Sequence, residues 1–318
     1  MGTAGDVIVG DRLTKFYGHD RGVEDLTFSV APGEVFGFLG PNGAGKTTTI
    51  RTMLDFIRPT SGTIRLFGLD AHHRGPEIHA RVGYLPGELA LYERLTGERY
   101  LRDFASFRGG IEFGHAGNLA ERLGLDLSKR IKDLSHGNKQ KVGLVQAFMH
   151  RPDLLIMDEP TQGLDPLVQQ TFYAMLDEER ARGTTVFLSS HVMPEVERVC
   201  DRVGIIREGR LATVSDIGDL KARVRRRIEL HFDGPAPARA FENLPGVLDV
   251  RGHGDELSIA IEGSVDPVIK EAARHTVVNV ETHEPSLEDL FLAYFGPNGE
   301  APADDTSGGG NPDPGGAP

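Results

Sequence analysis

A phosphate-binding loop is the first feature of the sequence that could do chemistry. The pattern G-x-x-x-x-G-K-[ST] follows the apolar run Val35–Leu39 and precedes a helical pattern that starts near Thr48, as such a loop requires. Its glycines let the backbone wrap around phosphate with the N–H groups pointing inward. Lys46 would place a charge on the β- and γ-phosphates, and the Thr47 hydroxyl would ligate Mg²⁺. The expected nucleotide-binding segment is Gly40, Pro41, Asn42, Gly43, Ala44, Gly45, Lys46, Thr47 and Thr48.

Two adjacent carboxylates follow a second apolar run. Leu154–Met157 ends in Asp158 and Glu159, and a buried strand delivers such residues to the edge where open α/β sheets bind ligands. Successive side chains of a strand point to opposite faces, so the two carboxylates can take different tasks. Asp158 would hold Mg²⁺, directly or through water, and Glu159 would polarise the attacking water. The sequence therefore predicts ATP hydrolysis, although phosphate-binding loops also occur in kinases and GTPases.

A histidine follows a third apolar run of the same kind. His191 comes shortly after Thr185–Leu188, so it could reach the γ-phosphate and the attacking water. A lone histidine in such a place is more often structural, but the two motifs described above favour a catalytic role. The predicted catalytic residues are therefore Lys46, Glu159 and His191.

The elements that must position these residues follow an α/β pattern. From about residue 7 to 220, short apolar runs alternate with helical patterns, and the continuous runs suit strands of a parallel sheet buried on both faces. The stretch from about 86 to 132 is helical and more charged, and we expect it to form a subdomain on this sheet.

A change of pattern near residue 221 predicts a second domain. The basic segment Lys221–Arg227 is interpreted as a linker or a strand edge. Beyond it we expect a small α+β domain over 221–296 and a disordered tail over 297–318, which is rich in Gly, Pro, Asp and Ser. The predicted elements of this domain are strands at Ile228–Phe232, Leu257–Ile261 and Val277–Val280, and helices opening at Pro267 and at Ser286–Phe295.

The composition argues against several classes of protein. No apolar run in the 318 residues approaches the roughly 18–20 needed to cross a bilayer, and Met1–Asp6 lacks the features of a signal peptide. The single cysteine, Cys200, excludes an intramolecular disulfide and a zinc site built from cysteines. The formal net charge of −12 argues against nucleic acid as a partner. These features favour a cytoplasmic protein.

Further motifs make the sequence resemble the ATP-binding subunit of ABC transporters. Leu134–Gln140 lies between the loop and Asp158, and Thr161–Pro166 follows the Asp-Glu pair. The order of all these motifs over about 7–220 is similar to that of the family. The resemblance implies an α/β P-loop ATPase domain of the ABC type with a helical subdomain at about 86–132. It also implies an ATPase that drives transport through a separate transmembrane permease.

The resemblance implies a second ATPase subunit, paired head-to-tail so that two ATP molecules are sandwiched. Carried over to this chain, Ser135 and Gly137 contact the γ-phosphate bound to the partner, and Asp165 lies at the dimer interface. Tyr17 matches the aromatic residue that stacks on adenine, although a lone tyrosine would more often be a packing residue. A homodimer is expected, and pairing with a different ATPase chain stays open.

Two positions depart from the family. The signature is usually Leu-Ser-Gly-Gly-Gln, and here His136 and Asn138 occupy two of its five positions, so slower hydrolysis or altered pH dependence is expected. The glutamine that senses Mg²⁺ should follow Pro86, where this chain has Gly87 and then Glu88. Either Glu88 contacts the metal or its waters, or the loop acts through its backbone.

The segment Thr282–Phe291 resembles the C-terminal extension of bacterial drug and antibiotic exporter ATPases of the daunorubicin-resistance type. This resemblance implies export of a drug, antibiotic or lipid-like substrate, with the chain bound peripherally at the inner face of the cell membrane. The alternative is an ABC-type ATPase that acts on ribosomes or DNA. Such proteins carry a second ATPase half, long coiled coils or cysteine zinc sites, and the sequence has none of these. The substrate stays open because the membrane subunit would determine it.

Overall fold

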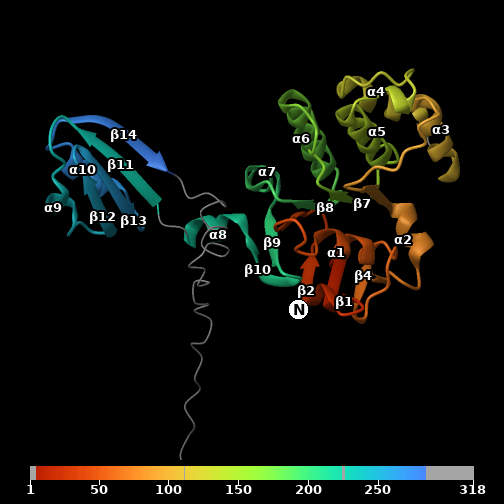
Figure 1. Cartoon of the computed structure of the whole chain (residues 1–318), viewed down its shortest axis with the longest axis horizontal. Helices are drawn as coiled ribbons and strands as arrows, with labels where there is room; N and C mark the ends of the chain where they lie inside the picture. Colours follow the sequence, from red (N-terminus) through yellow and green to blue (C-terminus); the bar gives the residue numbers. More distant parts are fainter. Residues whose placement is uncertain (1–4, 111, 224–225, 284–318) are drawn as a thin grey trace, which may run out of the picture. The chain divides into compact units, whose positions relative to one another are not determined.

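The computed structural model describes residues 5–110, 112–223 and 226–283, and the chain divides into two compact units (Figure 1). The first unit comprises Met1–Leu220 and the second Lys221–Pro318. Among the described helices, none combines the length and the apolar composition that crossing a bilayer would take. The predicted helix at Ser286–Phe295 and the predicted disordered tail at 297–318 lie outside the described residues, as does most of Thr282–Phe291.

A six-stranded sheet forms the centre of the first unit, in the order β10-β9-β3-β8-β7-β6. All neighbours pair in parallel except β9 and β10, so the predicted α/β fold is confirmed. Every residue of β3, β7 and β8 is buried, because other elements of the unit pack on both faces of the sheet. The strands are β3 (Val35–Leu39), β6 (Val82–Leu85), β7 (Leu154–Asp158), β8 (Thr185–Ser190), β9 (Arg202–Arg207) and β10 (Arg210–Asp216).

A second sheet in the same unit corrects the expectation of parallel strands throughout residues 7–220. It is antiparallel, with the order β2-β1-β4-β5, and it comprises β1 (Ile8–Tyr17), β2 (Asp20–Val30), β4 (Ser61–Leu66) and β5 (Leu69–Asp70). Phe28 of β2 packs against Phe36, Phe38 and Phe187 of the parallel sheet, with ring centroids 5.9–6.2 Å apart. Since these rings belong to one buried core, the two sheets fold as a single unit.

Helices surround the parallel sheet and form a separate lobe (Figure 1). The helices α1 (Lys46–Met53), α2 (Gly75–Arg81), α6 (Pro166–Ala181) and α7 (Met193–Val199) belong to the sheet region. The lobe contains α3 (Gly97–Phe107), α4 (Phe113–Arg122), the 3₁₀ turn η1 (Ile131–Asp133) and α5 (His136–Phe148). Side-chain caps fix where α3, α5 and α6 start, because Thr96, Ser135 and Asp165 accept hydrogen bonds from first-turn N–H groups.

In its described residues, the second unit is a four-stranded antiparallel sheet with two short helices. Its strand order is β12-β13-β11-β14, and α9 and α10 contribute Phe241 and Val268 to the core beneath it. Here β12 and α9 were absent from the sequence-based expectation. The elements are β11 (Arg226–Phe232), α9 (Ala238–Phe241), β12 (Val247–His253), β13 (Glu256–Ile261), α10 (Asp266–Ala272) and β14 (Val277–His283).

The basic segment Lys221–Arg227 is divided between two elements rather than forming one linker. Its first three residues end α8 (Ile217–Arg223), and Arg226 begins β11. Residues 224 and 225 lie outside the described part of the chain.

One buried carboxylate joins three parts of the first unit. Glu195 of α7 accepts a hydrogen bond from Ser190 at the end of β8 (2.9 Å), one from Thr161 in the loop after β7, and a long one from Tyr173 of α6 (3.5 Å). Burial raises the pKa of Glu195 above its ordinary value of 4.5, and the hydroxyl of Ser190 opposes part of this shift.

We expect Glu195→Gln to remove a pH dependence of stability. Because the pKa is raised in the folded state, the folded protein binds more protons than the unfolded chain above pH 4.5, and its stability falls as pH rises through the folded-state pKa. The free energy of unfolding is measured in urea at several pH values. As pH rises from acid to neutral, it should fall for the wild type relative to the variant.

The matched control is Glu178→Gln, for which the sign is reversed. Two hydrogen bonds of 2.7 Å from Arg122 lower the pKa of Glu178, so its contribution is lost as pH falls. If the free energy of unfolding changed with pH equally in the two variants, the account given for Glu195 would be contradicted.

Candidate active site

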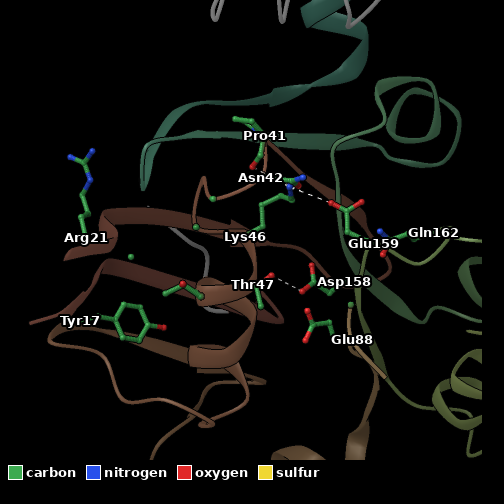
Figure 2. Close-up of a pocket in the computed structure, with 15 residues that line it drawn as sticks. Tyr17, Arg21, Pro41, Asn42, Lys46, Thr47, Glu88, Asp158, Glu159 and Gln162 are labelled. Atoms are coloured by element: carbon green, nitrogen blue, oxygen red, sulfur yellow. Dashed lines mark hydrogen bonds and ion pairs between the residues drawn. The ribbon is translucent and has the colours of Figure 1, made fainter. Parts of the chain in front are cut away.

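An open cleft of about 410 Å³ lies between the phosphate-binding loop and the end of β7. Figure 2 shows Lys46 and Thr47 facing Glu159 and Asp158 across it, with Tyr17 and Arg21 toward its other end. The structure therefore brings together residues that lie more than a hundred positions apart in the chain. The lining residues are Tyr17, Arg21, Gly22, Pro41, Asn42, Gly43, Gly45, Lys46, Thr47, Thr48, Gly87, Glu88, Asp158, Glu159 and Gln162.

The loop before α1 has the backbone geometry of an anion-binding site. Gly43 and Gly45 adopt φ angles of 79° and 111°, a region that favours glycine. A Cβ at Gly45 would also come 2.6 Å from Val23 Cγ1, so this position has no room for a side chain. No side chain caps α1, and its first turn contains no acidic residue. The first N–H groups of α1 can therefore donate hydrogen bonds to a phosphate, which the helix dipole also favours.

Lys46 is buried at the centre of the cleft and is directed inward. Its Nζ donates hydrogen bonds to the carbonyl oxygens of Gly40 (2.6 Å) and Pro41 (3.3 Å), and it lies 3.3 Å from Oε1 of Glu159. The contact with Glu159 is an ion pair and not a hydrogen bond. Oε1 of Glu159 is therefore a buried oxygen with no hydrogen-bond donor among the described residues. Such an oxygen is free to accept a proton from a water molecule that enters the cleft.

Asp158 and Thr47 form the oxygen pair expected for a magnesium site. Thr47 Oγ1 donates to Oδ2 of Asp158 (2.8 Å), and Ser189 donates to the other carboxylate oxygen. A hydroxyl and a carboxylate are hard oxygen ligands of the kind that Mg²⁺ prefers. A Cβ at Gly87 would come 3.3 Å from Oδ2, so the loop backbone lies against this carboxylate, and the exposed Glu88 lines the same cleft. The donor set fits the metal.

Glu159 occupies a strained turn beside His191. Its φ angle is 51°, which is uncommon for a residue with a side chain, and its N–H donates to the Ser189 carbonyl oxygen (3.1 Å). His191 lies with Nδ1 2.8 Å from Oε2 of Glu159. The histidine is not among the residues that line the cleft and reaches it through this carboxylate. Glu159 is thus held between Lys46 on one side and His191 on the other.

Tyr17 lies at the end of β1, on the edge of the cleft. Its side chain is 46% exposed. The ring lies against Gly22, where a Cβ would come 2.9 Å from Tyr17 Cε2, so this position has no room for a side chain. Lys15 Nζ is 5.3 Å from the ring centroid. An exposed ring at the edge of a phosphate-binding cleft offers a flat surface for a base.

Ser135, Gly137 and Asp165 lie outside the cleft formed by their own chain. The Ser135 side chain caps α5. The Asp165 side chain caps α6 by accepting two hydrogen bonds of 3.1 Å from N–H groups of its first turn. The two segments touch, because a Cβ at Gly137 would come 2.5 Å from the carbonyl oxygen of Gly163, and a Cβ at Gly163 would meet the ring of His136. The unusual His136 therefore packs over Gly163.

Sequence reasoning missed Arg21 and Gln162 in the cleft and the role of Ser189 beside it. Arg21 lies in the hairpin after Tyr17 and pairs with Glu24 and Glu208 at 3.4 and 3.7 Å. Gln162 follows Glu159 by three residues, and its N–H donates to the Glu159 carbonyl oxygen (3.2 Å). Proximity to a motif was the available signal for both residues.

Comparisons with known proteins agree with this geometry. The ABC transporter family matches residues 23–162. The bacitracin transport ATP-binding protein of Enterococcus faecalis is 36% identical over 93% of this chain and 98% of its own length. The linearmycin resistance ATP-binding protein of Bacillus subtilis is 34% identical, covering 91% and 98%.

Solved structures show the same fold. The structure of an ATP-binding subunit of an ABC transporter superposes with a TM-score of 0.63 and 32% identity, covering 68% of this chain and 92% of that one. A dimeric bacterial ABC transporter cassette superposes with a TM-score of 0.61 at 19% identity, covering 66% and 98%. This chain belongs to the ABC transporter ATP-binding proteins, and it is the subunit that binds and hydrolyses ATP to drive transport.

Proposed function

We propose that this chain powers the export of an antibiotic, drug or lipid-like substrate through a separate transmembrane permease. The observation that carries the ATPase part is the contact of Lys46 and Thr47 with the carboxylates of Glu159 and Asp158 in one cleft. The export part is supported by relatives that are named for bacitracin transport, linearmycin resistance and Nod factor export.

In this proposal the catalytic tasks divide among three residues. Lys46 exchanges its contacts with the loop carbonyls for contacts with the β- and γ-phosphates of ATP. Glu159 accepts a proton from the attacking water, for which its Oε1, which receives no hydrogen bond among the described residues, is available. His191 holds Oε2 of Glu159 through the contact of 2.8 Å, and from there reaches the γ-phosphate. Tyr17 stacks on adenine at the other end of the cleft.

Thr47 and Asp158 would hold Mg²⁺, and Glu88 would contact the ion or its water shell. The ion would neutralise charge on the β- and γ-phosphate oxygens. Asp158 is suited to this task because Ser189 orients one of its carboxylate oxygens while the other faces Thr47. Gly87 provides no side chain, so Glu88 takes the place of the glutamine usual in the family.

We further propose a head-to-tail homodimer with two ATP molecules between the subunits. Ser135 and Gly137 of one subunit would contact the γ-phosphate bound to the other, and Asp165 would link the two sites. Their position outside the chain's own cleft is consistent with this arrangement. The permease would dock on the helical lobe, where Tyr92 and Phe107 are 73% and 85% exposed. The complex would thus lie at the cytoplasmic face of the membrane, without nucleic acid as a partner.

Lys46→Ala and Glu159→Gln should separate ATP binding from hydrolysis. Loss of the Lys46 charge should weaken ATP binding about 10-fold or more. Glu159→Gln should bind ATP normally, trap a dimer and hydrolyse ATP about 100-fold more slowly, because the amide is not a base. Nucleotide affinity, phosphate release and mass in solution are the measurements. Wild-type turnover in Glu159→Gln would remove the general-base assignment.

Glu88→Ala should raise the Mg²⁺ concentration needed for half-maximal ATPase activity about 10-fold, as loss of an outer ligand does. It should also reduce stimulation by transport substrate in the assembled complex. The control is Glu93→Ala, a nearby exposed carboxylate that pairs with Lys139 at 3.0 Å and lies outside the cleft. If Glu88→Ala and Glu93→Ala both behaved as the wild type, the loop would act through its backbone.

The export proposal predicts that a membrane permease co-purifies with the full chain. Compounds resembling peptide antibiotics should then raise the rate of phosphate release by the reconstituted complex, whereas hydrophilic sugars should not. Co-purification with ribosomes or DNA, with ATPase activity stimulated by them, would contradict the proposal in favour of the other class of ABC ATPase.

A further inference from the structure

Gln140 is a buried polar side chain on α5 that ends the quoted motif Leu134–Gln140 and has no role in the proposed chemistry. Its side chain is 2% exposed. The amide nitrogen donates to the carbonyl oxygen of Pro160 (3.1 Å) and lies 3.5 Å from that of Glu159. Because both partners are carbonyl oxygens, only the NH₂ end of the amide can face them. Gln140 is therefore a hydrogen-bond donor to the turn that carries the proposed general base.

That turn needs external support. Glu159 has a left-handed φ angle of 51°, and such a conformation persists in a residue with a side chain when its surroundings hold it. The Glu159 N–H is bound by the Ser189 carbonyl of β8 (3.1 Å), and the Glu159 carbonyl is bound by Gln162 within the turn (3.2 Å). Gln140 adds the contact from the helical lobe, so β8, the turn itself and the lobe together hold the backbone that carries the Glu159 carboxylate.

Gln140 also belongs to the helix that begins at the signature motif. Ser135 caps α5, and Gln140 follows it by five residues on the same rigid helix. A displacement of the signature segment would therefore move the donor of the Glu159–Pro160 turn directly.

We propose that Gln140 is a positioning residue, which holds the backbone of Glu159 and makes the orientation of its carboxylate depend on the signature helix. The proposal rests on the roles proposed above for Glu159 and for the signature. Its consequence is that ATP bound against the signature of one subunit controls hydrolysis at the other ATP site of the dimer, through α5 and the Gln140 amide.

The test compares Gln140→Met with Gln146→Met in the full chain. Methionine keeps the length of the side chain and removes the donor. Gln146 lies on the same helix, but its amide oxygen accepts a hydrogen bond from Tyr100 of α3, on another part of the lobe. We expect kcat to fall about 10- to 100-fold in Gln140→Met, with KM for ATP within about two-fold of the wild type, because a misplaced catalytic group costs rate rather than binding.

The Hill coefficient for ATP should fall toward one in Gln140→Met, and Gln146→Met should leave kcat, KM and the Hill coefficient unchanged. Wild-type kcat per folded protein in Gln140→Met would overturn the proposal. A rise in KM without a change in kcat, or an equal loss of rate in Gln146→Met, would do the same.

A double variant separates this proposal from the general-base assignment. If Gln140 acts through Glu159, Gln140→Met should cost little additional rate in the Glu159→Gln background, and a full additive loss would overturn it. Wild-type turnover in Glu159→Gln alone would instead refute the proposed base.

A further variant, Gln140→Glu, tests the positioning role if the methionine variant does not fold. Its carboxyl donates only when protonated, so its rate relative to the wild type should rise as pH falls. A pH-independent ratio would contradict the positioning role.

Discussion

The carboxylate of Asp158 is the interaction on which the site depends. One of its oxygens accepts a hydrogen bond from Thr47 of α1, and the other accepts from Ser189 of β8. The end of β7 is thereby joined to the phosphate-binding loop and to the strand that leads to His191. These elements are distant in sequence, and hydrophobic packing of the sheet alone would not align their polar ends. Charge-assisted hydrogen bonds to one buried carboxylate have the direction that packing lacks.

The turn after β7 is the second structural constraint. Glu159 begins this turn in a left-handed conformation. Gln140 of α5 donates a hydrogen bond to the Pro160 carbonyl oxygen, and Thr161 donates one to Glu195 of α7. Further along, Gly163 lies against His136 of the signature. The loop thus contacts the helical lobe at two places and α7 at a third. A change in the lobe has a direct mechanical route to the carboxylate that would activate water.

Sequence patterns predicted the central elements more reliably than the outer ones. β3 has the predicted bounds, and β7 and β8 extend the predicted runs by one or two residues, because strands buried on both faces need continuous apolar residues. The antiparallel sheet and β12 were missed. Their strands are only partly buried, with bulges that shift the register in β1 and β12, so the alternation that identifies a half-exposed strand is interrupted.

By itself the sequence determined which chemical groups are present: the loop with Lys46, the carboxylates at the end of β7, and the order of motifs typical of ABC ATPases. Only the tertiary structure decided which groups meet. Local patterns record propensity and spacing, whereas the contacts of Glu159 with Lys46 and His191, and of Gln140 with the turn, join segments that folding brings together. No periodicity within one segment encodes a hydrogen bond to another, because its geometry depends on how both segments pack in the shared core.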